Sequence, residues 1–182
     1  ELYVGETKIG DEYLTPYYND YSSWNQVTTF DLTGSLKEGE NTVRFMLGGG
    51  WAASRFGLGR KDPNAHPGIY ANHTSLLAEI HVEFTDGTTL VIGTDETWTS
   101  TQSKVRSSSI YDGEVYDATF DTSETYPVRV DSAYDYSKVE DRLSVPLRIT
   151  ERIKPVELIH TPKDELVIDL GQEITGWLEF RC

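Results

Sequence analysis

Alternation of apolar and polar residues with a period of two is the feature that most constrains the fold of this chain. Good examples are residues 26–32 (QVTTFDL) and 41–47 (NTVRFML), which are rich in residues that favour strands. No stretch of about 10–12 residues shows the 3.6-residue period of an amphipathic helix. Only Leu32 to Leu36 suggests a single helical turn. This pattern predicts many short strands and argues against a helix-based architecture.

Short turn signals separate the apolar runs. Gly5 lies between two runs at the start of the chain, and Asp86-Gly87 separates the run 77–84 from the run 88–92. An Asp-Gly pair between apolar runs is a strong hairpin signal. Further strands are expected at 97–101, 104–110, 115–120, 146–149, 156–160, 166–170 and 177–180. The whole pattern predicts an all-β fold, an antiparallel β-sandwich of jelly-roll type, with a few strands of a second β-domain.

Composition divides the chain into three parts. Residues 1–127 carry most of the alternation and form the expected sandwich. Residues 128–144 are polar and charged with few strand signals, which suits a connector. The alternation resumes over 145–182, which we interpret as the truncated start of a second β-domain. The chain also opens on Glu1 inside an expected strand, so we expect it to be a piece of a longer protein.

The charge balance narrows the expected partners. The chain has 30 acidic and 16 basic residues and a formal net charge of −14. Nucleic-acid phosphates and anionic membranes would repel such a surface. No apolar run approaches the roughly 20 residues that span a bilayer. Neither nucleic acid nor a membrane is therefore expected as a partner, whereas neutral and cationic ligands remain open.

Motifs for nucleophilic or metal chemistry are missing from the sequence. The single cysteine, Cys182, excludes a disulfide framework and a cysteine zinc site. The four histidines have no ligand spacing. Neither a nucleophile elbow nor a phosphate-binding glycine loop is present. No catalytic residue is assigned on this basis.

A carboxylate pair occurs at Asp112 and Glu114. On a strand these side chains would share a face, at a spacing that suits an inverting glycosidase. Gly113 between them favours a turn or a bulge instead. Asp117 could join them in a calcium site, because Ca²⁺ takes six to eight oxygen ligands. A structural turn and contact with a ligand or cation both stay open, and Ca²⁺ is the one cofactor considered.

The segment 48–74 resists strand assignment and is rich in glycine and aromatic residues. Loops of this length in compact domains are usually functional or disordered. A sugar site needs a flat apolar ring for the C–H face of a pyranose and polar groups for its hydroxyls. The candidate sugar-binding residues, from this loop and the acidic turn, are Trp51, Arg55, Tyr70, Asp112, Glu114 and Tyr116. The alternative is that the aromatic side chains only pack the sandwich or a neighbouring domain.

Five blocks of the sequence resemble, in the same order, blocks of one known family. These are 1–21 (ELYVGETKIGDEYLTPYYNDY), 28–51, 76–98, 110–119 (IYDGEVYDAT) and 168–180 (IDLGQEITGWLEF). The first four are similar to the amino-terminal β-domain of bacterial α-L-rhamnosidases, and the fifth resembles the start of the β-domain that follows it. The resemblance covers nearly the whole chain.

This resemblance implies a parent enzyme that is an inverting glycoside hydrolase, which removes terminal α-L-rhamnose and carries its catalytic carboxylates in a helical barrel outside this chain. The chain itself would be an accessory, non-catalytic domain that supports the barrel. Its partners would be the remaining domains and rhamnose-containing glycans. The alternatives are a carbohydrate-binding module for rhamnose-type sugars and a protein-interaction or adhesion sandwich, for which the sequence shows no exposed apolar strand pattern. The compartment, cytoplasmic or exported, stays open.

Overall fold

The computed structural model describes residues 1–54 and 70–181 and divides the chain into two units, Glu1–Leu147 and Arg148–Cys182. Within these ranges the regular elements are β-strands and one short 3-10 helix, η1 (Tyr136–Lys138). The first unit contains β1 (Leu2–Val4), β2 (Thr7–Ile9), β3 (Asn25–Val27), β4 (Val43–Phe45), β5 (Glu79–Glu83), β6 (Thr89–Gly93), β7 (Thr99–Thr101), β8 (Val105–Ser109), β9 (Gly113–Tyr116), β10 (Thr125–Pro127) and β11 (Val139–Asp141). The second contains β12 (Glu157–His160) and β13 (Leu166–Asp169). No helix of the described ranges could cross a membrane.

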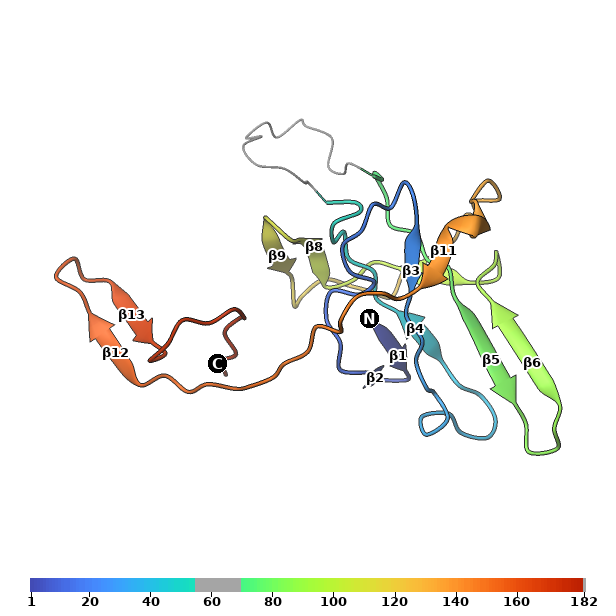
Figure 1. Ribbon diagram of the computed structural model, residues 1–182, viewed down its shortest axis with the longest axis horizontal. Helices are drawn as coiled ribbons and strands as arrows, with labels where there is room; N and C mark the ends of the chain where they lie inside the picture. The colour runs from blue at the N-terminus through green and yellow to red at the C-terminus, as the bar shows by residue number, and fades with distance from the viewer. Residues whose placement is uncertain (55–69, 182) are drawn as a thin grey trace. The chain divides into compact units, whose positions relative to one another are not determined.

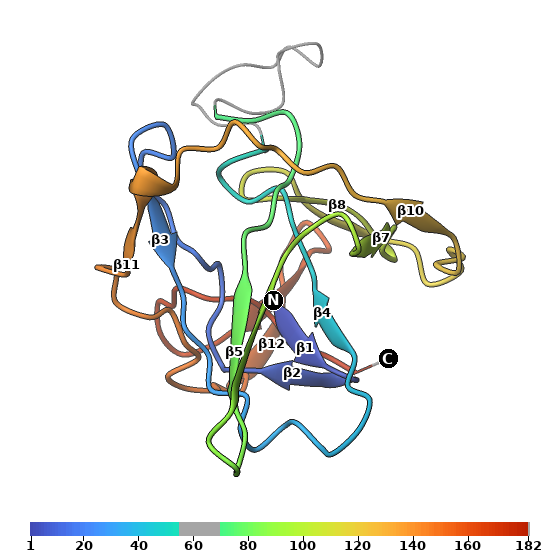
Figure 2. The ribbon, with the colours of Figure 1, turned by 90° about the vertical axis from the view of Figure 1, so that its right-hand side faces the viewer.

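Strand pairing is antiparallel with one exception. The largest sheet has the order β2-β1-β4, and four two-stranded ladders join β5 to β6, β7 to β10, β8 to β9 and β12 to β13. The exception is the parallel pair β3 and β11, which lie side by side in both views (Figures 1 and 2). The expected all-β, antiparallel architecture is therefore confirmed.

The buried core lies on the sheet β2-β1-β4. Leu2, Val4 and Ile9 are its buried members, because alternate residues of β1 point to the same face and Leu2 pairs with Ile9 across the ladder. A single helical turn, in which the Leu36 amide donates to the Leu32 carbonyl at 3.1 Å, confirms the turn expected there. The side chains packed against the core are Phe30, Leu32, Leu36, Val43 and Phe45.

Both expected hairpin turns are present. Val4 pairs with Thr7, which leaves Gly5 and Glu6 as a two-residue turn, and Gly5 has a φ of +57°. At the Asp86-Gly87 turn, Gly87 has a φ of +84° and donates its amide to Phe84. Positive φ favours glycine, so these positions explain why the sequence has glycine there.

Aspartates shape many of the other turns. In each case the carboxylate accepts the backbone N–H two residues further on, which is an Asx turn. The aspartates are Asp20, Asp31, Asp86, Asp95, Asp117, Asp121, Asp131, Asp135 and Asp169. In seven of the nine turns the residue that donates is Ser or Thr, so a repeated Asp-x-Ser/Thr pattern accounts for part of the acidity.

The division into units differs from the expected one. Residues 128–144 were expected to form a connector, but β11 pairs with β3 and the first unit continues to Leu147. η1 begins after Asp135, whose carboxylate accepts the Ser137 amide and caps it. The partners of β11 lie more than a hundred residues away along the chain, so local alternation gave no sign of this pairing.

The second unit is a hairpin followed by irregular chain. His160 pairs with Leu166, and the Thr161 amide donates to Glu165 to close the turn. The strands expected at 156–160 and 166–170 are present, whereas no strand forms at 146–149 or 177–180. Every residue of β12 is exposed. This unit therefore has little core of its own, and an isolated two-stranded hairpin of this kind is marginally stable in water.

Candidate functional site

Two of the candidate sugar-binding residues meet in an aromatic cluster. The ring of Trp51 lies 6.1 Å from that of Tyr18, and the ring of Tyr70 lies 5.1 Å from that of Tyr21. Tyr18 and Tyr21 are themselves 6.4 Å apart, and each of these three contacts is edge-to-face. Such contacts stabilise by about 0.5–1.5 kcal/mol each beyond their buried area. We refer to Tyr18, Tyr21, Trp51 and Tyr70 as the aromatic cluster.

A close backbone contact fixes the start of the loop that carries Trp51. A Cβ at Gly49 would lie 3.0 Å from the carbonyl oxygen of Ser108, so glycine suits this position. The hydroxyl of Ser54 donates to the same carbonyl at 3.2 Å, and the Ala71 amide donates to Ala52 at 3.1 Å. Residues 49–54 are thereby held against β8.

Two tyrosine hydroxyls of the cluster, those of Tyr21 and Tyr70, stay protonated over the physiological range. Burial raises the pKa of Tyr21 to about 12, and its hydroxyl donates to the carbonyl of Tyr17 at 2.5 Å. A hydrogen bond with Tyr18, at 3.5 Å between the hydroxyl oxygens, raises the pKa of Tyr70 to about 12. The cluster therefore offers ring faces and neutral hydroxyls, which is the chemistry that a sugar requires.

The acidic turn lies on a separate hairpin. Ser109 pairs with Gly113 across β8 and β9, and Gly113 has a φ of +79°, so the expected turn at Gly113 is confirmed. Asp112, Glu114 and Tyr116 are all exposed. The hydroxyl of Ser109 donates to Asp112 at 3.3 Å. Exposed carboxylates of this kind suit a turn or a weak ligand contact better than acid catalysis, which usually needs burial to raise a carboxyl pKa.

The calcium candidates gain no geometric support. Asp117 uses its Oδ1 to accept both the amide and the hydroxyl of Thr119, at 2.9 and 2.7 Å, and these bonds hold its pKa below the usual range. Over residues 1–54 and 70–181, no three His, Cys, Asp or Glu side chains form a group that could hold a metal ion. The absence of a cofactor, with calcium at Asp112, Glu114 and Asp117 as the alternative, stays a prediction.

The other candidates are placed as follows. Arg55 lies outside the described residues. The structure adds Tyr18 and Tyr21, which the candidate set omitted, although the density of aromatic residues over 13–24 was an available signal.

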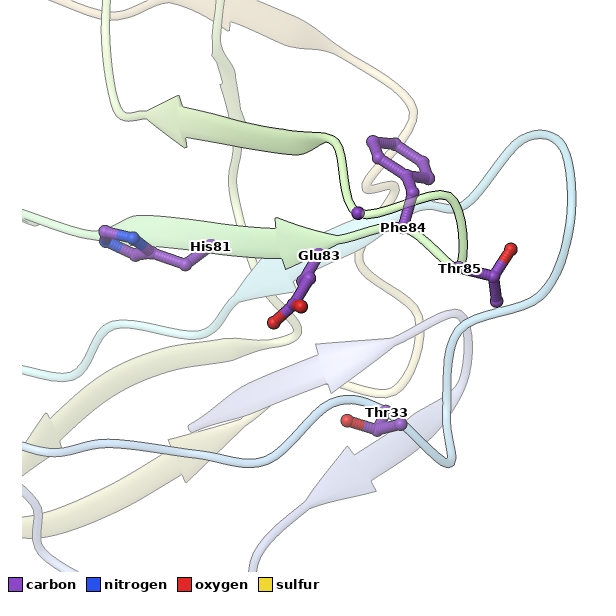
Figure 3. A pocket seen from close by; sticks show the side chains of 6 residues that line it. Thr33, His81, Glu83, Phe84 and Thr85 are labelled. Atoms are coloured by element: carbon purple, nitrogen blue, oxygen red, sulfur yellow. The ribbon is translucent and has the colours of Figure 1, made fainter.

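An open hollow at the tip of the β5–β6 hairpin, shown in Figure 3, is lined by Thr33, His81, Glu83, Phe84, Thr85 and Gly87. None of the candidate residues lines it.

A buried polar network holds the end of the first unit. The side-chain oxygen of Gln26, a residue only 6% exposed, accepts the Leu143 amide at 3.1 Å, the Ser144 amide at 3.1 Å and the Ser144 hydroxyl at 2.9 Å. One acceptor atom thus serves three donors from a segment more than a hundred residues away. The carbonyl oxygen has two lone pairs, so its hydrogen-bonding capacity is fully used.

A largely buried carboxylate holds the same segment. Glu12, whose side chain is 9% exposed, accepts Arg142 Nη1 at 2.6 Å and the Tyr17 hydroxyl at 2.7 Å. The bond to Glu12 raises the pKa of Arg142, while burial, and then the bond to Glu12, raises that of Tyr17. Arg142 and Glu12 are thereby held as an ion pair.

Leu147, the last residue of the first unit, is held through both of its backbone groups. Its amide donates to the Tyr17 hydroxyl at 3.1 Å, and its carbonyl accepts the Tyr13 amide at 3.0 Å. We call this set of contacts the exit seam; it consists of Glu12, Tyr13, Tyr17, Gln26 and residues 142–147. The seam fixes the backbone at Leu147, where the first unit ends.

Comparison with known proteins decides the family. A model of the α-L-rhamnosidase N-terminal domain matches residues 1–166. The chain belongs to this family. An α-L-rhamnosidase of Streptomyces avermitilis is 28% identical over 100% of this chain and 18% of its own length. One of Alteromonas sp. (strain LOR) is 25% identical over 94% of this chain and 19% of its own length.

The fold of a rhamnosidase N-terminal domain is also found in a solved structure. Native α-L-rhamnosidase from Aspergillus terreus matches with a TM-score of 0.83 and 25% identity, over 97% of this chain and 21% of that chain. The resemblance seen in the sequence is therefore confirmed. The chain spans about a fifth of the length of the rhamnosidases that it matches.

Proposed function

We propose that this chain is an accessory, non-catalytic domain of an α-L-rhamnosidase and acts as a scaffold for the rest of that enzyme. The parent enzyme would hydrolyse terminal α-L-rhamnose from glycosides. Membership of the N-terminal domain family supports this proposal, as does the small share of each relative that the chain matches. The exposure of Asp112 and Glu114 supports a non-catalytic role, because neither has the environment of a general acid.

The exit seam is the observation that carries the scaffold role. A scaffold must present the following chain in a fixed direction, and Leu147 is anchored through both its amide and its carbonyl. Hydrogen bonds contribute about 0.5–1.5 kcal/mol each, or about 1.5–3 when one partner is charged. Four side-chain contacts tie the segment to Gln26 and Glu12, and together they hold it in place while the domain remains folded.

A chimera tests the scaffold role. This chain replaces the region that it matches in the Streptomyces avermitilis enzyme, and activity is measured with p-nitrophenyl α-L-rhamnoside. The isolated chain should give no turnover, whereas the chimera should be active. In the chimera, Gln26→Leu should shorten the half-life of activity on heating and leave KM unchanged. The matched control is Gln102→Leu, which removes an exposed acceptor of Arg106.

Two results would contradict this proposal. Turnover by the isolated chain that disappears in Asp112→Asn would show that the domain is catalytic. An unchanged half-life in the Gln26→Leu chimera, with a clear loss of stability in the isolated variant, would show that the seam serves the domain alone.

The aromatic cluster favours a second candidate function, weak binding of rhamnose-type sugars. Trp51 and Tyr70 lie 19 positions apart in the sequence, yet both pack onto the pair Tyr18 and Tyr21. A monosaccharide offers few atoms, so we expect a Kd in the high micromolar to millimolar range, roughly −4 to −6 kcal/mol. NMR titration with L-rhamnose should shift resonances of the cluster.

Matched variants assign the sugar contact. Trp51→Ala should weaken binding by about 1–2 kcal/mol if the indole stacks on the sugar. Tyr136→Ala removes an exposed ring that contacts only Tyr134 among the ring contacts described, so it should leave binding unchanged. Resonance shifts confined to another surface, or no shifts at roughly 20 mM rhamnose, would contradict sugar binding at the cluster and leave the scaffold as the one proposed function.

A further inference from the structure

Tyr17 belongs to the exit seam and also contacts the aromatic cluster. Its side-chain hydroxyl donates to Glu12 at 2.7 Å and accepts the Leu147 amide at 3.1 Å. Its backbone carbonyl accepts the hydroxyl of Tyr21 at 2.5 Å, and the ring of Tyr21 packs edge-to-face against that of Tyr70. The two ends of a residue that is only 8% exposed therefore join the seam to the cluster.

The backbone of Tyr17 has a conformation that it keeps only while its contacts hold it. Its φ is +73°, and among the described residues other than glycine only Leu14 and Asp164 also have a positive φ. Such a conformation costs free energy for a residue with a Cβ and persists where neighbouring contacts over-determine it. The contacts here are the two bonds of the hydroxyl and the bond from the Tyr17 amide to the Leu14 carbonyl at 2.9 Å. Loss of the hydroxyl bonds would let φ relax, which would move the carbonyl away from Tyr21.

Residues 134–147 hold the part of the chain that follows the cluster tyrosines. Lys138 Nζ donates to the Ser22 carbonyl at 2.7 Å, and the Asn25 side chain donates to the Tyr134 hydroxyl at 3.0 Å. β11 comes directly after Lys138 and pairs with β3, and the bonds of the exit seam follow. We call residues 134–147 the strap. The strap thus lies against the same stretch of chain that carries two rings of the cluster.

We propose that Tyr17 is a positioning residue that couples the aromatic cluster to the strap, so that a ligand at the cluster tightens the strap and an ordered strap improves binding. For its ligand this inference rests on the second proposed function, sugar binding, whereas the coupling of the two sets of contacts is measured without one. Such coupling is reciprocal: the factor by which an ordered strap raises affinity is the factor by which bound ligand favours the ordered strap. A binding event at the cluster would therefore reach Leu147, the last residue of the first unit.

A double-mutant cycle in the 182-residue chain measures the coupling by urea denaturation. Tyr17→Phe removes the hydroxyl bonded to the strap, and Tyr21→Phe removes the hydroxyl bonded to the Tyr17 carbonyl, while both variants keep their rings. The change in the unfolding equilibrium constant of the double variant should fall short of the product of the single changes by at least about threefold. The control cycle combines Tyr17→Phe with Tyr70→Phe, which removes a hydroxyl bonded to Tyr18, and should agree with the product within about twofold.

Hydrogen exchange measured by NMR locates the coupling. Tyr21→Phe should raise the exchange rate of the Leu147 amide at least about fivefold, because it loosens the Tyr17 backbone whose side chain accepts that amide. The internal reference is the Gly5 amide, which donates to the Thr42 carbonyl at 2.8 Å and should keep its rate. The control variant of the cycle should leave both rates unchanged. A general loss of stability would raise both rates together, so it cannot imitate the expected result.

L-Rhamnose adds the ligand to the same measurements. At roughly 20 mM, where a millimolar site approaches saturation, it should slow exchange of the Leu147 amide at least about threefold. Tyr17→Phe should raise the Kd for rhamnose at least about threefold, because the cluster then loses the hold of the strap. Rhamnose binding that leaves both quantities unchanged would overturn the coupling of ligand to strap.

The coupling and the sugar function fail in different ways. An additive cycle, together with an unchanged Leu147 exchange rate in Tyr21→Phe, would overturn the coupling whether or not rhamnose binds. A coupled cycle with no rhamnose binding in any variant would overturn the sugar function and support the positioning role of Tyr17.

Discussion

The exit seam and the Asx turns both consist of polar side chains that accept backbone amides, but they differ in burial and in range. At the seam, the partners of Gln26 lie 117 and 118 positions away, and Gln26 is 6% exposed. In an Asx turn such as that of Asp86, the partner is two positions away and exposed. A broken exposed bond is replaced by water, whereas a buried donor left without a partner costs about 1–3 kcal/mol. The two regions therefore contribute very differently to stability.

The largest effect is expected for the buried acceptor Gln26. Gln26→Leu removes the partner of two amides and one hydroxyl, so unfolding free energy should fall by about 2–4 kcal/mol. Gln102→Leu makes the same chemical change at an exposed side chain and should cost less than about 0.5 kcal/mol. Urea denaturation of both variants measures the difference. Equal losses would show that burial does not separate the two regions.

A smaller effect is expected when a single hydroxyl is removed from the seam. Tyr17→Phe loses the bonds to Glu12 and Leu147 and should destabilise by about 1–2 kcal/mol. Tyr3→Phe loses an exposed bond to Glu1 and should cost less than about 0.5 kcal/mol. The same urea experiments compare the pair. If Tyr3→Phe proved the more damaging variant, the assignment of the seam as the stronger region would be wrong.

The range of the contacts also explains which parts of the fold could be predicted. The hairpins at Gly5 and at Asp86-Gly87 were predicted because their pairing residues lie close along the chain. β11 was missed, since its parallel partner β3 lies more than a hundred residues earlier and its three residues show no alternation. The contacts of the exit seam could not be predicted for the same reason. No pattern near Gln26 in the sequence indicates that its side chain accepts the amides of Leu143 and Ser144.

The candidate sugar-binding residues show the same difference between local patterns, which the sequence reveals, and long-range contacts, which it does not. Trp51 and Tyr70 could be selected by composition, because a glycine-rich aromatic loop is unusual. Their association with Tyr18 and Tyr21 depends on tertiary packing, which no local pattern reports. The turn at Gly113 was predictable from the glycine itself, whose φ is positive. The Asp-x-Ser/Thr repeats were also present in the sequence as a local signal. They give a structural reason for part of the acidity of the chain, which taken by itself would suggest a ligand-binding role for these carboxylates.

Acid titration tests the contribution of the Asx turns directly. Hydrogen bonds from Thr88 and Thr97 lower the pKa values of Asp86 and Asp95 below the ordinary 3.8. A lowered pKa contributes stability that is present above the unfolded value and is lost as pH falls through the folded one. The melting temperature should therefore fall below about pH 4. Asp86→Asn with Asp95→Asn should flatten this dependence, and an unchanged pH profile in the double variant would contradict it.

The smallest effect is expected at the acidic turn, where the carboxylates are exposed and local. Asp112→Asn and Glu114→Gln keep an acceptor oxygen at each position, so unfolding free energy should stay within about 0.5 kcal/mol of the starting chain. If the turn held calcium with a millimolar Kd, then about 10 mM CaCl₂ would stabilise the chain by about 1.4 kcal/mol relative to EDTA. We expect no such shift, because Asp117 already uses an oxygen for Thr119. A calcium-dependent rise in melting temperature that disappears in Asp112→Asn would instead make this turn a ligand site, and would show that exposed, local polar groups here serve binding rather than the turn alone.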